Sequence, residues 1–128
     1  MINNERTERA QGEKCEKSKF TILEALSASG LRSCRYALEC AGIDEIIAND
    51  LSVAAVDEIK QNIKFNNVEK IVTPNCADAI DLMTQHRSQA KNVECIDLDP
   101  YGSATPFLDT AVQATSFSIF YKDKIPFL

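Results

Sequence analysis

The 128-residue sequence has no tryptophan, one histidine, four glycines and four prolines. Such low glycine and proline contents exclude a collagen-like or linker-like chain. No apolar run approaches the roughly 20 residues of a membrane-spanning helix, and no secretory signal precedes the apolar segments, so no membrane association is predicted. Because 45% of the residues are hydrophobic, we expect a folded domain with a single core.

Positive charge is also scarce, since 14 Lys and Arg face 19 Asp and Glu and give a net charge of −5. This balance argues against a domain that binds nucleic acid by charge alone. The five cysteines are Cys15, Cys34, Cys40, Cys76 and Cys95. Their odd number and scattered spacing favour free thiols, buried as small hydrophobic side chains, in a reducing intracellular compartment. No pair has zinc-site spacing and His86 has no second histidine to join it, so no metal site is predicted.

The chain divides into two parts by composition. Residues 1–19 carry five basic and four acidic residues and almost nothing apolar, so we expect a charged, disordered leader. In residues 20–128, apolar runs alternate with helical stripes. Strands are predicted at 20–26, 45–50, 70–73, 93–98 and 117–121, and helices at 31–41, 53–66, 79–86 and 105–112. Strands and helices that alternate in this way predict an α/β fold with a parallel sheet and helices on both faces.

Several signals mark the ends of these elements. Ser52 is expected to cap the second helix, and Pro74 is expected to end the third strand. Thr105 and Pro106 are expected to supply the N-cap and the first-turn proline of the last helix.

Ligands of open α/β sheets bind at the carboxyl ends of the strands, where the strand order reverses. The first such end is the small-residue loop Ser27-Ala28-Ser29-Gly30. Small residues let the backbone approach a ligand, and the next helix offers free N–H groups, so Ser27, Ser29 and Gly30 are candidate cofactor-binding residues. A tight strand-to-helix turn is the alternative. In an E-x-G-x-G-x-G template that begins at Glu24, only Gly30 keeps its glycine, which disfavours a dinucleotide-dependent oxidoreductase.

Two further strand ends carry acids. Asp50 closes the second strand 20 residues after Gly30, a position from which a carboxylate can accept two hydrogen bonds from a ribose diol. The alternative is an exposed carboxylate near the start of the next helix. Asp78 follows the third strand, where it can accept a hydrogen bond from an adenine amino group or cap the short helix that begins at Ala79.

The turn Asp97-Leu98-Asp99-Pro100-Tyr101-Gly102 follows the fourth strand. Methylation of a base amino group requires an acceptor for one N–H, a carbonyl for the other and an aromatic plane for the ring. Asp99, the turn carbonyls and Tyr101 can supply these, with Pro100 keeping the turn rigid. A turn in which Asp97 and Asp99 are merely solvated is the alternative.

Two arginines begin the first predicted helix. Because the helix dipole opposes a cation at this end, Arg32 is expected to have a fixed anionic partner. Arg35 is expected to be solvated.

Four segments carry a family resemblance: residues 23–33 (LEALSASGLRS), 48–50 (AND), 77–79 (ADA) and 96–103 (IDLDPYGS), the last continuing into 106–109 (PFLD). With them, the chain resembles the tRNA (guanine-26-N2)-dimethyltransferases over about residues 20–116. The resemblance implies a Rossmann-like class I S-adenosylmethionine-dependent methyltransferase fold that methylates the N2 atom of a guanine in tRNA. It implies that Arg32, Asp50, Asp78 and Ala79 contact the cofactor, and that Asp99, Pro100 and Tyr101 bind the amine.

The sequence also departs from the family. Residues 1–19 lack the family's upstream Asn-Arg-Asp element, residues 117–128 diverge from its continuation, and its C-terminal tRNA-binding domain is missing. We therefore expect an incomplete sheet and the central piece of a longer enzyme. The alternative is a non-catalytic fragment that acts through protein contacts.

Overall fold

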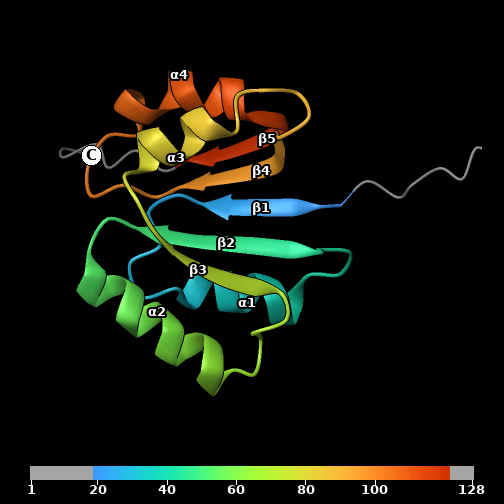
Figure 1. Cartoon of the computed structure of the whole chain (residues 1–128), viewed down its shortest axis with the longest axis vertical. Coiled ribbons are helices and arrows are strands. Elements are labelled where there is room, and N and C mark those ends of the chain that lie inside the picture. The colour runs from blue at the N-terminus through green and yellow to red at the C-terminus, as the bar shows by residue number, and fades with distance from the viewer. Residues whose placement is uncertain (1–18, 122–128) are drawn as a thin grey trace, which may run out of the picture.

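The computed structural model describes residues 19–121, in which five strands and four helices alternate (Figure 1). They are β1 (Thr21–Glu24), α1 (Leu31–Glu39), β2 (Glu45–Asp50), α2 (Val53–Phe65), β3 (Val72–Cys76), α3 (Ala79–Gln85), β4 (Val93–Leu98), α4 (Thr105–Ala114) and β5 (Thr115–Tyr121). The order and types of the elements match the prediction. Apart from Lys19, the predicted disordered leader lies outside the described residues, as does the end of the divergent tail.

The strands form one parallel sheet in the order β3-β2-β1-β4-β5. The chain starts at the central strand β1, builds outward through β2 to β3, and then crosses back to β4 on the other side of β1. The strand order therefore reverses between β1 and β4. In open α/β sheets, ligands bind at such a reversal, outside the carboxyl ends of the strands.

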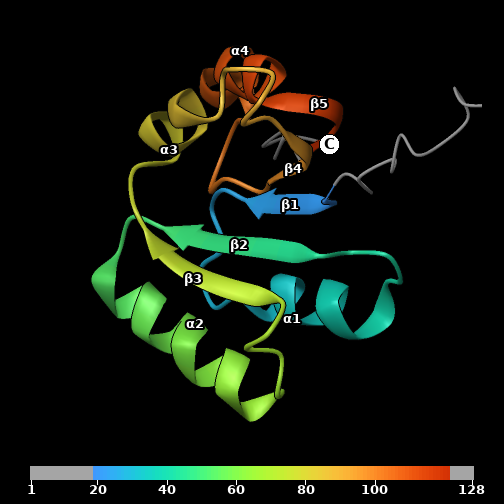
Figure 2. The same ribbon diagram turned by 45° about the vertical axis from the view of Figure 1, so that its right-hand side comes forward.

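Helices cover both faces of the sheet (Figures 1 and 2). On one face Ile22 and Ile46 pack against Ile59 of α2 and the other buried residues of α1 and α2. On the other face Leu23 and Ile96 belong to a second core with α3 and α4. Successive residues of the inner strands alternate between these two cores, so apolar side chains lie on both faces of these strands rather than on one. Each fully buried Leu or Ile contributes about 1.5–3 kcal/mol, which makes these two cores the main source of stability.

Two helices differ from their predicted stripes. α1 ends at Glu39, and its predicted apolar positions Leu31 and Leu38 are 53% and 60% exposed. In α2, Ser52 caps the helix as predicted by accepting a hydrogen bond from the Ala55 amide at 3.3 Å. However, Val53 is 69% exposed, because the buried face of α2 begins one turn later.

Two predicted element ends were wrong. Pro74 lies inside β3, paired with Ala48, rather than ending the strand. This is tolerated because β3 is the edge strand of the described sheet, where a missing N–H removes no ladder bond on the outer side. The N-cap of α4 is Ala104, and Thr105 is the first helical residue. Its amide is satisfied by Ser103 Oγ at 3.1 Å, so the hydroxyl of the preceding turn takes the capping role.

The prediction of buried free thiols was correct for two cysteines. Cys34 and Cys95 are buried, whereas Cys40 and Cys76 are exposed. Burial, with a smaller effect of the nearby Asp97, raises the pKa of the Cys95 thiol to about 11. Within residues 19–121, no helix is long and apolar enough to cross a membrane.

Candidate functional site

The carboxyl ends of β1, β2 and β4 meet at one edge of the sheet (Figure 1). The last residue of β1, Glu24, pairs with Ala48 of β2 on one side and with Asp97 of β4 on the other. The loops that leave these strands therefore start at nearly the same level. This register brings together three of the four segments that the sequence singled out.

The loop after β1 is held in place by hydrogen bonds of both its side chains and its backbone. The buried Ser27 hydroxyl donates to Glu24 Oε2 at 2.9 Å, and the Ser29 carbonyl accepts from Asn62 Nδ2 at 2.8 Å. Gly30 has a φ of +75°, and a Cβ there would lie 3.1 Å from the Ile59 side chain. The predicted tight turn is thus present, and glycine is required at its end by both backbone angle and space.

Asp50 ties this loop to the start of the next helix. Its Oδ2 accepts from the Ala28 amide at 3.0 Å and its Oδ1 from the Ser52 amide at 2.9 Å. Each carboxylate oxygen has a second lone pair, so the group keeps acceptor capacity while it is held in place. Asp50 therefore lies beside the small-residue loop, as the spacing predicted.

Asp78 is the N-cap of α3. Its Oδ1 accepts from the amides of Ile80 and Asp81 at 2.9 and 3.0 Å, so the capping alternative is confirmed. Ala79, the first residue of α3, is buried against the second core. No hydrogen bond given for Asp78 links it to Arg32 or Asp99, so Asp78 belongs to a separate part of the same edge.

Arg32 joins the two acids of the Asp97–Asp99 turn. Its Nη2 donates to Asp97 Oδ1 and its Nη1 to Asp99 Oδ2, both at 2.6 Å. The predicted anionic partner of Arg32 is therefore confirmed, and two carboxylates rather than one fill this role. The alternative of a solvated Asp97 was wrong, because this side chain is only 1% exposed. Arg35 instead forms an exposed ion pair with Glu39, one turn along α1.

The two remaining residues of the predicted amine site lie differently. Pro100 is buried, and its carbonyl accepts from the Gly102 amide at 2.9 Å in a tight turn. The Tyr101 ring is fully exposed at the rim of the site. The structure thus brings Asp99 and Pro100 into the packed part of the site and leaves Tyr101 on its surface.

Glu24 is a buried carboxyl group that the sequence analysis did not select. It is 2% exposed and its Oε2 accepts from the hydroxyls of both Ser27 and Ser33. Burial raises the pKa of Glu24 above its usual value, although the two hydroxyl donors act in the opposite direction. The sequence did contain a signal for this residue, an acid directly at the end of an apolar strand. However, its burial depends on helices that cover both faces of the sheet, which the sequence of one strand does not show.

Asn49 is a second buried polar residue that the analysis did not select. Its Nδ2 donates to the carbonyls of Ala25 and Ala77 at 3.0 and 2.9 Å, and its Oδ1 accepts from Asn75 Nδ2 at 2.7 Å. The side chain therefore connects the ends of β1, β2 and β3 below the site. Its hydrogen-bonding groups are satisfied by these partners, which marks Asn49 as a brace rather than a ligand-binding group.

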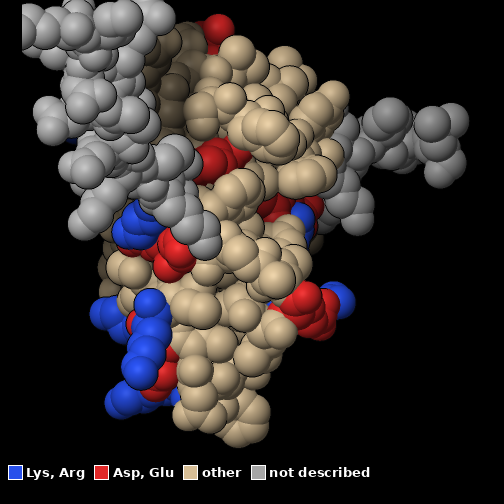
Figure 3. Space-filling model, turned by 90° about the vertical axis from the view of Figure 1, so that its right-hand side faces the viewer, with Lys and Arg blue, Asp and Glu red and all other residues tan. Residues whose placement is uncertain are grey.

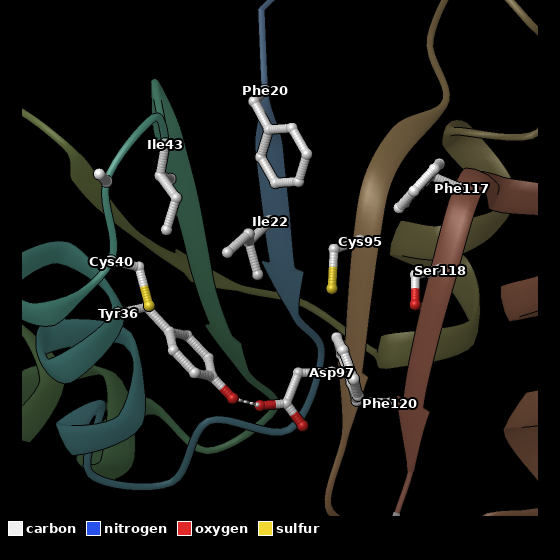
Figure 4. Close-up of a pocket in the computed structure, with 11 residues that line it drawn as sticks. Phe20, Ile22, Tyr36, Cys40, Ile43, Cys95, Asp97, Phe117, Ser118 and Phe120 are labelled. Carbon is white, nitrogen blue, oxygen red and sulfur yellow. Dashed lines mark hydrogen bonds between the residues drawn. The ribbon is translucent and has the colours of Figure 1, made fainter.

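A pocket of about 510 Å³ opens between α1 and the adjacent face of β1, β4 and β5. It is lined mainly by apolar residues, among them Phe20, Ile22 and Phe120 (Figure 4). Asp97 and Tyr36 lie at one end, where the Tyr36 hydroxyl donates to Asp97 Oδ2 at 2.6 Å. Burial and the Asp97 carboxylate raise the pKa of Tyr36 to about 12, so its hydroxyl keeps the proton that it donates.

Negative charge exceeds positive charge among these residues. Asp97 and Asp99 share one cation, Arg32, and Asp50 and Glu24 add two further carboxyl groups. The opposite edge of the sheet, seen in Figure 3, has basic and acidic side chains interspersed. A cluster with excess negative charge favours a cationic ligand. Within the described range, no group of three or more potential metal ligands is present.

The family model of the N2,N2-dimethylguanosine tRNA methyltransferases matches residues 4–120. The chain belongs to this family. The match begins upstream of the expected residue 20 and ends beyond residue 116, so it also includes most of the charged segment before β1.

Relatives in animals and fungi agree with this assignment. The tRNA (guanine(26)-N(2))-dimethyltransferase of Mus musculus is 51% identical over 107 residues, which are 84% of this chain and 16% of that protein. The enzyme of the same name from Schizosaccharomyces pombe is 55% identical over 97 residues, or 76% of this chain and 17% of that protein. The chain thus spans about one sixth of the length of these curated relatives.

Solved structures give the same fold. Trm1 from Pyrococcus horikoshii, solved with S-adenosyl-L-methionine, is 36% identical with a TM-score of 0.68, over 76% of this chain and 29% of that one. The tRNA m1G37 methyltransferase of M. jannaschii is 20% identical with a TM-score of 0.60, over 77% of this chain and 28% of that one, and supports the fold alone. The predicted Rossmann-like class I methyltransferase fold is therefore confirmed.

The site of this family member combines three features. They are the small-residue loop after β1, the carboxylate of Asp50 at the end of β2, and the two acids Asp97 and Asp99 that Arg32 connects. Such an arrangement can bind a nucleoside with a cationic group next to a polar amine.

Proposed function

We propose that the chain is the cofactor-binding and catalytic part of a tRNA (guanine-26-N2)-dimethyltransferase, which transfers methyl groups from S-adenosylmethionine to a guanine N2 atom in tRNA. Family membership and the similarity to Pyrococcus horikoshii Trm1 support this proposal. The observation that carries it is the carboxylate of Asp99, of which one oxygen is bonded by Arg32 at the start of α1 and the other has no hydrogen-bond partner. A tRNA substrate implies an intracellular site of action.

The site fits the cofactor in charge and shape. S-adenosylmethionine carries a sulfonium and an ammonium group, and both favour an edge where carboxylates outnumber cations. We assign Asp50 to the ribose diol, because its carboxylate keeps acceptor capacity beside the loop. We assign Ser27, Ser29 and Gly30 to a close approach between the ligand and the loop backbone.

The adenine end of the cofactor is assigned to the start of α3. We assign Asp78 and Ala79 to this end and Arg32 to the methionine side. Asp78 can serve there because its Oδ1 caps α3 while a second oxygen remains on the same carboxylate.

The reaction is an in-line displacement in which the N2–C bond forms as the C–S bond breaks and N2 loses a proton. When bound, the cofactor supplies the methyl group. Asp99 accepts a hydrogen bond from the amine, orients its lone pair and takes up the proton on Oδ1. Pro100 fixes the turn, and the exposed Tyr101 ring offers a surface for a base that has left its helical stack.

A methyl-transfer assay with labelled S-adenosylmethionine tests this proposal. The chain is expected to label a tRNA with guanine at position 26 and not the same tRNA with adenine there. Asp99→Asn is expected to lower the rate about 100-fold, because the amide cannot take up the proton. Asp109→Asn, at an exposed position of α4, is the matched control. Equal rates for Asp99→Asn and the unmodified chain would contradict the proposal.

The exposed face of β5 favours the second candidate, a fragment that acts through protein contacts. Phe117 and Phe120 are 82% and 61% exposed beside the apolar pocket. A folded chain that neither binds S-adenosylmethionine nor transfers methyl groups, but elutes as an oligomer in size-exclusion chromatography, would support this candidate.

A further inference from the structure

We infer that Arg32 and Tyr36 are positioning residues, which hold Asp99 so that one oxygen of its carboxylate points at the substrate amine. This inference rests on the proposed function, because it concerns the acceptor of that reaction. It assigns Arg32 a role beyond cofactor contact and assigns Tyr36 a positioning role.

The guanidinium of Arg32 connects a rigid acid to a less constrained one. Asp97 belongs to the inner strand β4 and is 1% exposed, whereas Asp99 lies beyond the strand end and is 33% exposed. One arm of the planar fork bonds each acid, both at 2.6 Å. The orientation of the Asp99 carboxylate is thereby fixed to that of Asp97, and lysine, with its single ammonium group, cannot bridge the two in this way.

Tyr36 completes the anchor from the same helix. It lies four residues after Arg32, so both side chains project from one side of α1 toward β4. Its hydroxyl donates to Asp97 Oδ2 at 2.6 Å, and Figure 4 shows the ring reaching across to this carboxylate. Asp97 thus uses one oxygen for each α1 residue. Two hydrogen bonds to α1 hold Asp97 in place. Because Arg32 is itself fixed by Asp97, it can hold Asp99 in one orientation.

The state of the Asp99 carboxylate shows what this arrangement achieves. Oδ2 accepts from Arg32, whereas Oδ1 is buried and is the sole buried side-chain polar atom without a hydrogen-bond partner among the described residues. A buried oxygen without a partner is unfavourable, so a donor that bonds Oδ1 is favoured there. Because Arg32 already bonds Oδ2, the unpartnered Oδ1 is the stronger acceptor left for the amine hydrogen, and its direction favours one approach of the base.

The competing interpretation is that Arg32 contacts the cofactor alone. Loss of Arg32 would then weaken S-adenosylmethionine binding, and Tyr36→Phe would leave the reaction unaffected. Under our inference, both changes reduce turnover once cofactor is saturating, and neither abolishes cofactor binding. Tyr36→Phe is the more decisive variant, because it keeps the ring in the apolar pocket and removes a single hydroxyl.

The test uses the full chain with Tyr36→Phe, Arg32→Lys and the control Arg35→Lys, which alters only the exposed pair with Glu39. The first readout is the χ1 rotamer distribution of Asp99, obtained from three-bond NMR couplings. One rotamer is expected in the unmodified chain and in Arg35→Lys, and averaged rotamers are expected in the other two variants. A single Asp99 rotamer in Tyr36→Phe and Arg32→Lys would overturn the inference.

The second readout is turnover on tRNA at saturating S-adenosylmethionine, together with the Kd of the cofactor. We expect turnover at saturating cofactor to fall about tenfold in Tyr36→Phe and about 100-fold in Arg32→Lys. The cofactor Kd should change less than about threefold in Tyr36→Phe and should rise in Arg32→Lys, which also loses its proposed cofactor contact. Unchanged turnover, or a loss of cofactor affinity with turnover retained at saturation, would overturn the inference. If the unmodified chain transfers no methyl group, the proposed function fails, while the rotamers still decide whether Arg32 and Tyr36 hold Asp99.

Discussion

Gly30 meets two constraints that the other described glycines do not combine. Its φ is +75° and a Cβ would lie 3.1 Å from Ile59, whereas Gly42 has a similar φ of +81° and nothing within 4 Å. A residue with a Cβ would lose about 1 kcal/mol of folding free energy at either position because of the positive φ. At Gly30 alone, crowding against Ile59 would add about 1–3 kcal/mol to this cost. The loop therefore depends on the absence of a side chain at this residue.

Alanine substitution separates these two effects. Gly42→Ala is expected to lower the free energy of unfolding by about 1 kcal/mol and Gly30→Ala by about 3 kcal/mol. Urea unfolding monitored by circular dichroism measures both. Equal losses in the two variants would show that Ile59 does not restrict the loop.

Glu24 gives a pH dependence with a definite sign. Its pKa is raised in the folded state from the ordinary value of 4.5, so the folded chain binds more protons than the unfolded one. The stability contributed by this group is present at low pH and is lost as pH rises from 4.5 through the folded pKa. Glu24→Gln should therefore gain stability relative to the unmodified chain as pH rises across this window.

The measurement is urea unfolding of both proteins at a series of pH values. Other carboxyl groups cancel when the two curves are subtracted, so the difference reports Glu24 alone. Glu58→Gln, at an exposed position of α2, is the control and should show no such trend. A difference that stays constant or falls with rising pH would contradict the assignment.

Among single residues, sequence reasoning found those whose role is local. Gly30, Asp50 and Asp99 could be predicted because each follows a strand in a recognisable motif. The burial of Asp97 and the role of Tyr36 could not, because they depend on how α1 packs over β4. The residue type gives the chemistry, but the partner 61 positions away comes only from the fold.

At the scale of elements, strand and helix types were predictable because apolar periodicity is a local property. The ends of the strands and helices were less predictable. Pro74 normally breaks a strand, and its place inside β3 follows from the position of β3 at the edge of the described sheet. Strand order is a property of the whole sheet, so no window of sequence around Pro74 contains it.

The short helix α3 offers a test of two roles for one residue. Asp78→Asn keeps an oxygen that can cap α3, so stability should remain within a few tenths of a kcal/mol, whereas Asp78→Ala should cost about 1 kcal/mol. If Asp78 also binds the cofactor, Asp78→Asn should weaken S-adenosylmethionine binding at unchanged stability. Thermal unfolding and calorimetry distinguish these effects. Equal cofactor affinity in Asp78→Asn and the unmodified chain would limit Asp78 to capping.

At the scale of the whole molecule, the parallel sheet assembles the site. The reversal of strand order between β1 and β4 brings Arg32 within 2.6 Å of acids more than 60 positions away in sequence. The net charge of −5 argues against a domain that binds nucleic acid by charge alone, and several of these acids gather where a cationic cofactor is proposed to bind. Acidity therefore argues against binding RNA by charge alone and is compatible with a methyl donor.

The most direct test of this account is calorimetric titration of S-adenosylmethionine into the 128-residue chain. One-to-one binding is expected, weakened at least about tenfold by Asp50→Ala, which removes the proposed diol acceptor, and unchanged by Asp57→Ala on the exposed face of α2. Absence of both binding heat and a thermal shift with the cofactor, or equal affinity in all three proteins, would contradict the account.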